Sequence, residues 1–271
     1  MKKLIINLGF ILGVSTMVVG CTDYLDSDYL FEERVNIENV FQSKDYTNEW
    51  LAKGYAYMKH DYLQQVNSKK NTSFNFADDM YYIDLNYVDW KGGNYTEKGL
   101  GSGNSLYIWQ AAYQAIRHVS IFIHNVDGNK ELTEAEITDM KGQAHFLRAY
   151  FYWMLIRSFG PVPIVPDEGV DYTKEYDEIA YPRSTYDECA DYIAEELVKA
   201  ATMLDDERDV QNIVRPTRGA ALALRSRVLL YAASPLYNGQ APSEVIDALV
   251  DKSGRKLLSD TYDNRKWARA A

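Results

Sequence analysis

Residues 133–163 read TEAEITDMKGQAHFLRAYFYWMLIRSFGPVP, and this stretch decides the fold of the chain. Its apolar residues recur at spacings of three and four, which is the spacing of one helix face: Ile137, Met140, Ala144, Leu147, Phe151 and Met154. Thr133 and Glu136 form a capping box at its start, and Gly160-Pro161 stops it. The stretch therefore predicts a helix over 133–159 with a buried face.

Helical periodicity continues on both sides of this segment. The segment 105–126 is apolar on two sides, so it should lie between two neighbouring helices. In the segment 184–204, Ser184 and Asp187 predict a second capping box, and Cys189 falls on the apolar stripe as a buried structural thiol. No period-two run of convincing length occurs, so the predicted fold class is all-α. Further helices are expected over 47–64, over 217–233 and from the NRKWARAA end of the chain.

An internal repeat adds to this prediction. GQAHFLR at 142–148 and GAALALR at 219–225 share Gly, Ala, Leu and Arg at matching places, and each is expected to begin a helix. Small residues at fixed places let helix pairs nest, which favours a tetratricopeptide-like helical repeat. No plain 34-residue period is present, so long irregular loops should interrupt the units. These loops are predicted at 65–104, 160–183 and 234–263.

Composition excludes several classes of protein. The chain has 271 residues, 46% of them hydrophobic, and a net charge of -10, so it should bury a core and repel nucleic acid. Two Cys and four scattered His leave no disulfide framework or zinc module. The glycine cluster GLGSG at 99–103 lacks the dinucleotide-binding spacing, and no P-loop or nucleophile-elbow motif occurs. The sequence predicts no cofactor, no metal site and no catalysis.

The first residues, MKKLIINLGFILGVSTMVVGC, carry two Lys and then an apolar run of about 16 residues. A membrane-spanning helix needs about 20, so the segment is typical of a secretory signal peptide. Val18-Val19-Gly20-Cys21 resembles a bacterial lipobox, which predicts acylation of Cys21. The predicted organisation is a signal peptide over 1–20, an acidic tether over 21–46 and a helical domain over 47–271.

The combination of motifs resembles the SusD/RagB family. QAHFLRAYFYWMLIRSFGPVPIV is similar to one signature of that family, RGAALALRSRVLLYAA is similar to the second, and an early Tyr-Leu-Asp follows the lipobox. The resemblance implies a cell-surface, outer-membrane lipoprotein of a Bacteroidetes-type bacterium. It would bind an oligosaccharide or polysaccharide without hydrolysing it and would partner a SusC-like TonB-dependent transporter. Family members run to roughly twice this length, so the chain is expected to be an N-terminal portion.

Sugars present C–H faces that lie flat on aromatic rings, while their hydroxyls need polar partners. The stretch FNFADDMYYIDLNYVDWKGGNY at 74–95 offers both, and its candidate ligand-binding residues are Asp79, Tyr82, Asn86, Tyr87 and Trp90. Some of these rings could instead anchor the loop to the helices. A peptide- or protein-binding scaffold is the alternative function, because helical repeats commonly bind peptides. Helix-stripe tryptophans are expected in the core: Trp50, Trp109 and Trp153.

Overall fold

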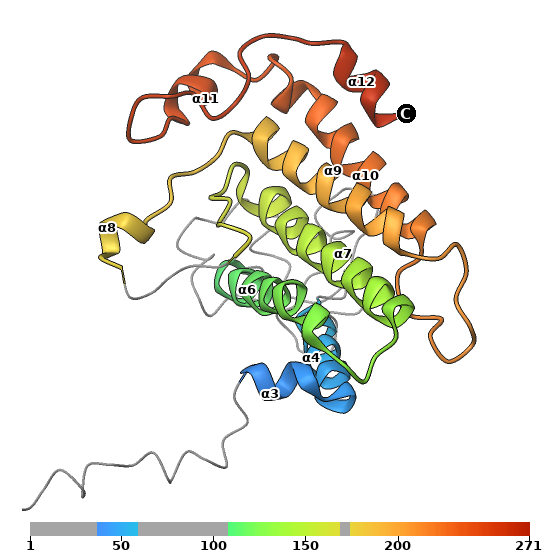
Figure 1. Ribbon diagram of the computed structural model, residues 1–271. Coiled ribbons are helices and arrows are strands. Elements are labelled where there is room, and N and C mark those ends of the chain that lie inside the picture. The colour runs from blue at the N-terminus through green and yellow to red at the C-terminus, as the bar shows by residue number, and fades with distance from the viewer. Residues whose placement is uncertain (1–36, 59–107, 169–173) are drawn as a thin grey trace, which may run out of the picture. The chain divides into compact units, whose positions relative to one another are not determined.

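The computed structural model describes residues 37–58, 108–168 and 174–271, and the chain divides into two units, Met1–Val40 and Phe41–Ala271. Of the first unit, only residues 37–40 are described, and they begin helix α3. The helices, as Figure 1 labels them, are α3 (Ile37–Gln42), α4 (Lys44–Ala56), α6 (Trp109–Asn125), α7 (Glu134–Phe159), α8 (Tyr176–Ile179), α9 (Tyr186–Met203), α10 (Arg218–Ala233), α11 (Ser243–Ala248) and α12 (Arg265–Ala270). Two 3-10 turns, η4 (Val126–Gly128) and η5 (Pro235–Tyr237), follow α6 and α10.

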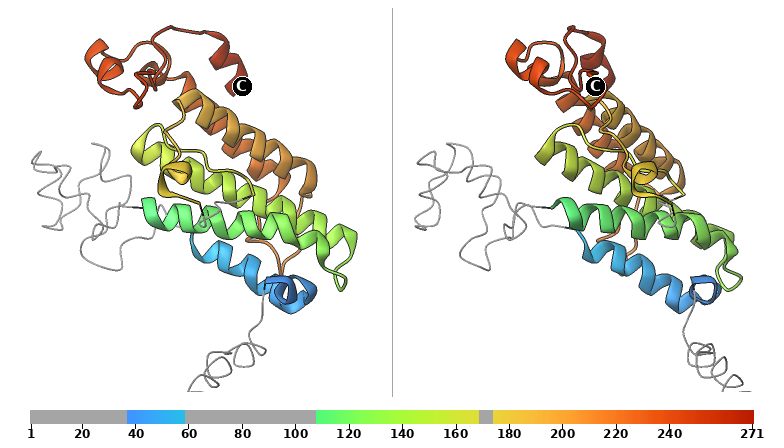
Figure 2. Two further views of the ribbon diagram at one scale, coloured as in Figure 1. Left: turned by 60° about the vertical axis from the view of Figure 1, so that its left-hand side comes forward. Right: turned by 90° about the vertical axis from the view of Figure 1, so that its left-hand side faces the viewer.

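Helices α6, α7, α9 and α10 lie side by side in the order in which the chain forms them (Figures 1 and 2). Helix α4 packs against α6 and α7, and α12 packs against α10. Within the described residues the only β-type pairing is an isolated bridge between Val250 and Lys256. The all-α fold class predicted from the periodicity is confirmed.

Helix α7 is the centre of this arrangement. Its predicted stripe is buried from Met140 onward, and Tyr152, Trp153, Leu155 and Ile156 on its other sides are buried as well. A helix that is apolar all round must have neighbours on several sides, and α7 has α6 on one side and α9 on the other. The capping box of Thr133 and Glu136 is present, and the helix ends at Gly160 with a φ of 68°.

The second capping box lies one residue later than predicted. Thr185, not Ser184, caps α9: its hydroxyl accepts from the backbone N–H of Glu188, whose carboxylate accepts from the N–H of Thr185. The N–H of Ser184 instead donates to the carbonyl of Val162. The chain entering α9 is thus still paired with the segment after α7 at residue 184. Cys189 is buried as predicted, and burial raises the pKa of its thiol to about 11.

The repeat also differs from the prediction. GAALALR begins at the second residue of α10, but GQAHFLR lies well inside α7 rather than at its start. Helix α4 begins earlier and ends earlier than the predicted segment 47–64, so Met58 lies beyond it. The predicted loops 160–183 and 234–263 contain the short elements α8, η5 and α11. Trp153 is buried, whereas Trp50 and Trp109 are only half-buried.

Candidate functional site

The candidate ligand residues Asp79, Tyr82, Asn86, Tyr87 and Trp90 lie outside the described residues, as does Cys21. The structure describes the helical frame to which the segment 59–107 is joined. The chain enters that segment after Met58, just past α4, and leaves it at Ile108, just before α6. The geometry of the α4–α6 pair therefore sets the separation of the two ends of the candidate loop.

Trp50 of α4 and His118 of α6 fix this pair of helices. Their rings stack with centroids 4.6 Å apart and planes 4° apart. The indole Nε1 of Trp50 donates to the carbonyl of His118 (3.0 Å), and the His118 ring nitrogen Nε2 lies 2.8 Å from the carbonyl of Trp50. Burial lowers the pKa of His118, so the neutral ring is favoured. Both residues are used in joining the helices.

A small apolar hollow lies where the chain leaves α4 and returns to α6. Tyr57 and Ile108 line it together with Tyr150, Phe151 and Met154 of α7 and residues of α6. Its volume of about 10 Å³ is no larger than a water molecule requires, whereas small-molecule sites usually measure roughly 300–1,000 Å³. This hollow therefore cannot itself hold a sugar.

A buried ionic cluster joins α7 to α9 and was not predicted from the sequence. The guanidinium of Arg148 donates to the Glu196 carboxylate at 2.7 Å, and Nδ1 of His145 lies 2.8 Å from the same oxygen. Both Arg148 and Glu196 are almost fully buried. Lys199, whose side chain is half-exposed, donates to the other Glu196 oxygen at 2.8 Å. A lone Arg within the apolar α7 pattern was the one available signal that a buried acid would face it.

Opposing influences act on the Glu196 carboxyl group. Burial alone would raise its pKa, but the hydrogen bond with His145 and the charge of Arg148 outweigh burial and lower the pKa to about 2. Glu196 is therefore a carboxylate at neutral pH. A buried carboxylate with several charge-assisted partners holds helices in one register, because any shift would leave a charge unpaired.

The cluster reaches the surface through the segment 161–168, which we call the strap. Arg148 also donates to Asp167 (3.3 Å), and the hydroxyl of Tyr192 donates to the same carboxylate at 2.7 Å. The strap's backbone is held as well, since Tyr113 donates to the carbonyl of Pro163 and the N–H of Val165 donates to Tyr152. The strap that follows Gly160 thus returns to Arg148 of the FLR motif through Asp167.

The described part of the chain contains no group of three His, Cys, Asp or Glu residues placed to hold a metal ion. Among the helices described, none combines the length and apolar character needed to cross a bilayer.

Residues 23–230 match the model of a SusD-like family described as starch-binding and associating with the outer membrane. The chain is 33% identical over 55 residues to SusD-like protein P25 of Formosa agariphila, a match covering 20% of this chain and 10% of that protein. In structure it resembles BT4246 (26% identity, TM-score 0.67, 84% of this chain and 38% of that one). It also resembles a SusD-like protein from Bacteroides fragilis (25% identity, TM-score 0.52, 72% and 36%).

The chain thus spans little more than a third of the length of the solved relatives, although most of its own length aligns with them. The family match extends over the capped helix α7, the buried Arg148–Glu196 cluster and the strap, and ends inside α10. The chain belongs to the SusD-like family.

Proposed function

We propose that this chain is a glycan-binding lipoprotein of the outer membrane that captures an oligosaccharide and delivers it to a SusC-like TonB-dependent transporter. The observation that carries the proposal is the match of residues 23–230 to a family described as starch-binding and associating with the outer membrane. The chain would act by binding alone, with no cofactor. Hydrolysis is left to other proteins.

The proposed ligand platform is the stretch 74–95, with Tyr82, Tyr87 and Trp90 stacking on sugar faces and Asp79 and Asn86 receiving or donating hydroxyl hydrogen bonds. Two features support this placement. The stretch combines rings and short polar side chains at high density, and the α4–α6 pair that carries it is joined by the Trp50–His118 contacts. A platform on a rigid frame loses less entropy on binding.

The membrane part of the proposal concerns the N-terminal residues. Residues 1–20 would be removed as a signal peptide, Cys21 would be acylated and 21–46 would space the helical domain from the bilayer. Each buried methylene contributes about 0.8 kcal/mol, so several acyl chains would hold the protein firmly without a spanning helix.

The test is isothermal calorimetry after a glycan panel on affinity gels. Trp90→Ala and Tyr82→Ala should weaken binding of the best glycan at least tenfold and leave the melting temperature within a few degrees. Trp153→Ala is the matched control: this ring is buried, so its loss should cost about 3–5 kcal/mol of folding stability.

Three results would contradict the proposal. If no glycan retards the chain on gels while peptides bind, the scaffold alternative replaces it. If both loop variants bind as the wild type does, the platform lies elsewhere. Release of reducing ends from the bound polysaccharide would show catalysis.

A further inference from the structure

The connection between α9 and α10, residues 204–217, reaches the last turn of α4. Neighbouring helices of a bundle are usually joined by roughly 2–8 residues, so this connection is longer than the join itself requires. The guanidinium of Arg215 lies over the ring of Tyr55, 4.3 Å from its centroid. Two parts of the chain that are distant in sequence therefore meet at the end of α4.

Tyr55 is bonded to α7 as well. Its hydroxyl donates to Oε1 of Gln143 at 2.8 Å, and Nε2 of the same amide donates to Asp139 at 2.7 Å. Burial raises the pKa of Tyr55 to about 12, so the hydroxyl keeps the proton that it donates. Because Gln143 is buried and both ends of its amide are hydrogen-bonded, it holds Tyr55 against α7 in one orientation.

The contacts return to the connection through Arg208. This side chain forms an ion pair with Asp139 at 2.7 Å, and its Nε and Nη2 donate to the carbonyl of Pro216 at 3.0 and 2.6 Å. Pro216 directly follows Arg215, so the contacts form a closed circuit. The side chain of Arg208 is only 9% exposed, and a nearly buried charge is costly to separate from its partners. We call the five side chains of this circuit the brace: Tyr55, Asp139, Gln143, Arg208 and Arg215.

The brace acts on the residues at which α4 ends. The backbone N–H of Tyr57 donates to the carbonyl of Gly54 (3.3 Å), and that of Met58 donates to the carbonyl of Tyr55 (2.9 Å). Backbone bonds at a helix end open readily unless other contacts hold the turn. Trp50 is held more than one turn earlier, whereas Tyr55 is held in the last turn itself. The brace therefore fixes the direction in which the chain leaves α4.

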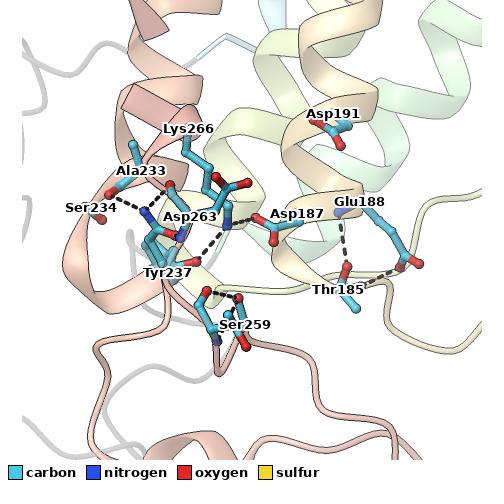
Figure 3. A network of polar contacts seen from close by, with 12 residues as sticks. Thr185, Asp187, Glu188, Asp191, Ala233, Ser234, Tyr237, Ser259, Asp263 and Lys266 are labelled. Atoms are coloured by element: carbon cyan, nitrogen blue, oxygen red, sulfur yellow. Dashed lines mark hydrogen bonds and ion pairs between the residues drawn. The ribbon is translucent and has the colours of Figure 1, made fainter. Parts of the chain in front are cut away.

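The residues that follow α10 are fastened at a different place. Lys266 donates to Asp187 near the start of α9 and to the carbonyl of Tyr237, as Figure 3 shows. These contacts tie the chain after α10 to α9, whereas the brace ties the chain before α10 to α4 and α7. Each of the two networks can therefore be altered by itself.

We propose that Arg215 is a positioning residue for glycan binding: by holding Tyr55, it keeps the last turn of α4 in the conformation to which the proposed platform is joined. The inference rests on the proposed function, since the stretch 74–95 follows this turn in the chain. A support that is ordered before the ligand arrives reduces the entropy lost on binding. Loosening it should weaken binding although no group that touches the ligand is removed.

The experiment uses Arg215→Gln in the full chain and two measurements. Hydrogen exchange of the Tyr57 and Met58 amides needs no ligand, and it should become at least fivefold faster than in the wild type. Calorimetry with maltoheptaose, a soluble probe for a family described as starch-binding, should show at least threefold weaker affinity. Arg215→Lys keeps a cation that can lie over the ring, so it should restore part of both.

Two control variants should leave the exchange of these amides and the affinity unchanged. Arg218→Gln makes the same change in charge at the start of α10, where the guanidinium bonds the carbonyl of Ala201 and the carboxylate of Asp206. Lys266→Gln loosens the network of Figure 3 and so controls for a general loss of stability.

Unchanged exchange or unchanged maltoheptaose affinity in Arg215→Gln would overturn the positioning role, as would equal losses in the two control variants. The proposed platform fails separately, through unchanged affinity in the Trp90 and Tyr82 variants. If those variants lose affinity and Arg215→Gln does not, the platform stands and the role of Arg215 is overturned.

Discussion

Arg148 illustrates how one residue of a sequence motif can organise a large part of the fold. Its guanidinium bonds Glu196 on α9, Ser120 on α6 and Asp167 on the strap, so it contacts three separate parts of the chain from the middle of α7. The charge of Glu196 raises the pKa of Arg148 despite burial, which alone would lower it. The pair is therefore fully ionised at neutral pH.

At this scale we predict the effect of Glu196→Gln. In this variant a neutral amide replaces the buried carboxylate, and of its ionic contacts Arg148 keeps only the longer one, with Asp167. The loss should destabilise the fold by about 3 kcal/mol at pH 7, as breaking other buried pairs does. Urea unfolding followed by circular dichroism measures the change. Glu195→Gln, a neighbouring exposed position, should change stability by less than about 0.5 kcal/mol.

The pH dependence has a definite sign. Folding lowers the pKa of Glu196 from 4.5 to about 2, so its stabilising contribution is present above about pH 4.5 and is lost as the pH falls toward 2. The stability difference between wild type and Glu196→Gln should therefore shrink over that window. If the stability difference between wild type and Glu196→Gln stayed constant from pH 7 to pH 2, the pKa of Glu196 would not be lowered by its buried partners.

Among residue-level predictions from sequence, the Thr133 cap and the buried Cys189 are confirmed, and the Ser184 cap is wrong. Ser184 and Thr185 are both good capping residues with an acid three positions later, so local preference cannot separate them. The long-range pairing of Ser184 with Val162 decides between them, because it keeps residue 184 outside the helix.

At the scale of elements, α7 and α9 approach closely at Gly142. A Cβ placed on Gly142 would lie 2.8 Å from the Cβ of Met203, an atom too close to the backbone to move aside. The corresponding glycine of the sequence repeat, Gly219, has nothing nearer than the Thr217 hydroxyl at 3.7 Å. The two copies of the repeat thus have the same residue types at matching places, but their glycines differ in how closely a neighbouring element packs against them.

We therefore predict opposite effects for the same substitution in the two copies. Gly142→Ala should force α7 and α9 apart and destabilise the fold by about 1–3 kcal/mol. Gly219→Ala should be neutral or stabilise by up to about 1 kcal/mol, because Ala favours the helix and meets open space. Thermal unfolding of both variants is the measurement, and equal destabilisation by both would contradict the packing at Gly142.

At the scale of the whole molecule, family membership and the helical architecture are established, while attachment to the membrane is a proposal that rests on the family description and on the lipobox. No helix of the described residues is long and apolar enough to cross a membrane. The residue on which membrane attachment can be tested is Cys21.

Cys21→Ala should move the protein from the membrane fraction to the soluble fraction when it is expressed in a host that processes lipoproteins. Fractionation with and without detergent, followed by immunoblotting, measures this. Cys189→Ala is the control: that thiol is buried in α9, so its loss should leave the protein in the membrane fraction. Retention of Cys21→Ala in the membrane would refute the lipobox assignment.

What the sequence by itself determined is local or follows from a motif. Helix periodicity, the first capping box, the stop at Gly160 and the family were readable because each depends on residues a few positions apart or on an ordered signature. Only the tertiary structure decided which distant residues meet, such as Arg148 with Glu196 and Trp50 with His118. The physical reason is that the stability of a buried charge or ring depends on what packs against it. That is set by helix neighbours many residues away rather than by local preference.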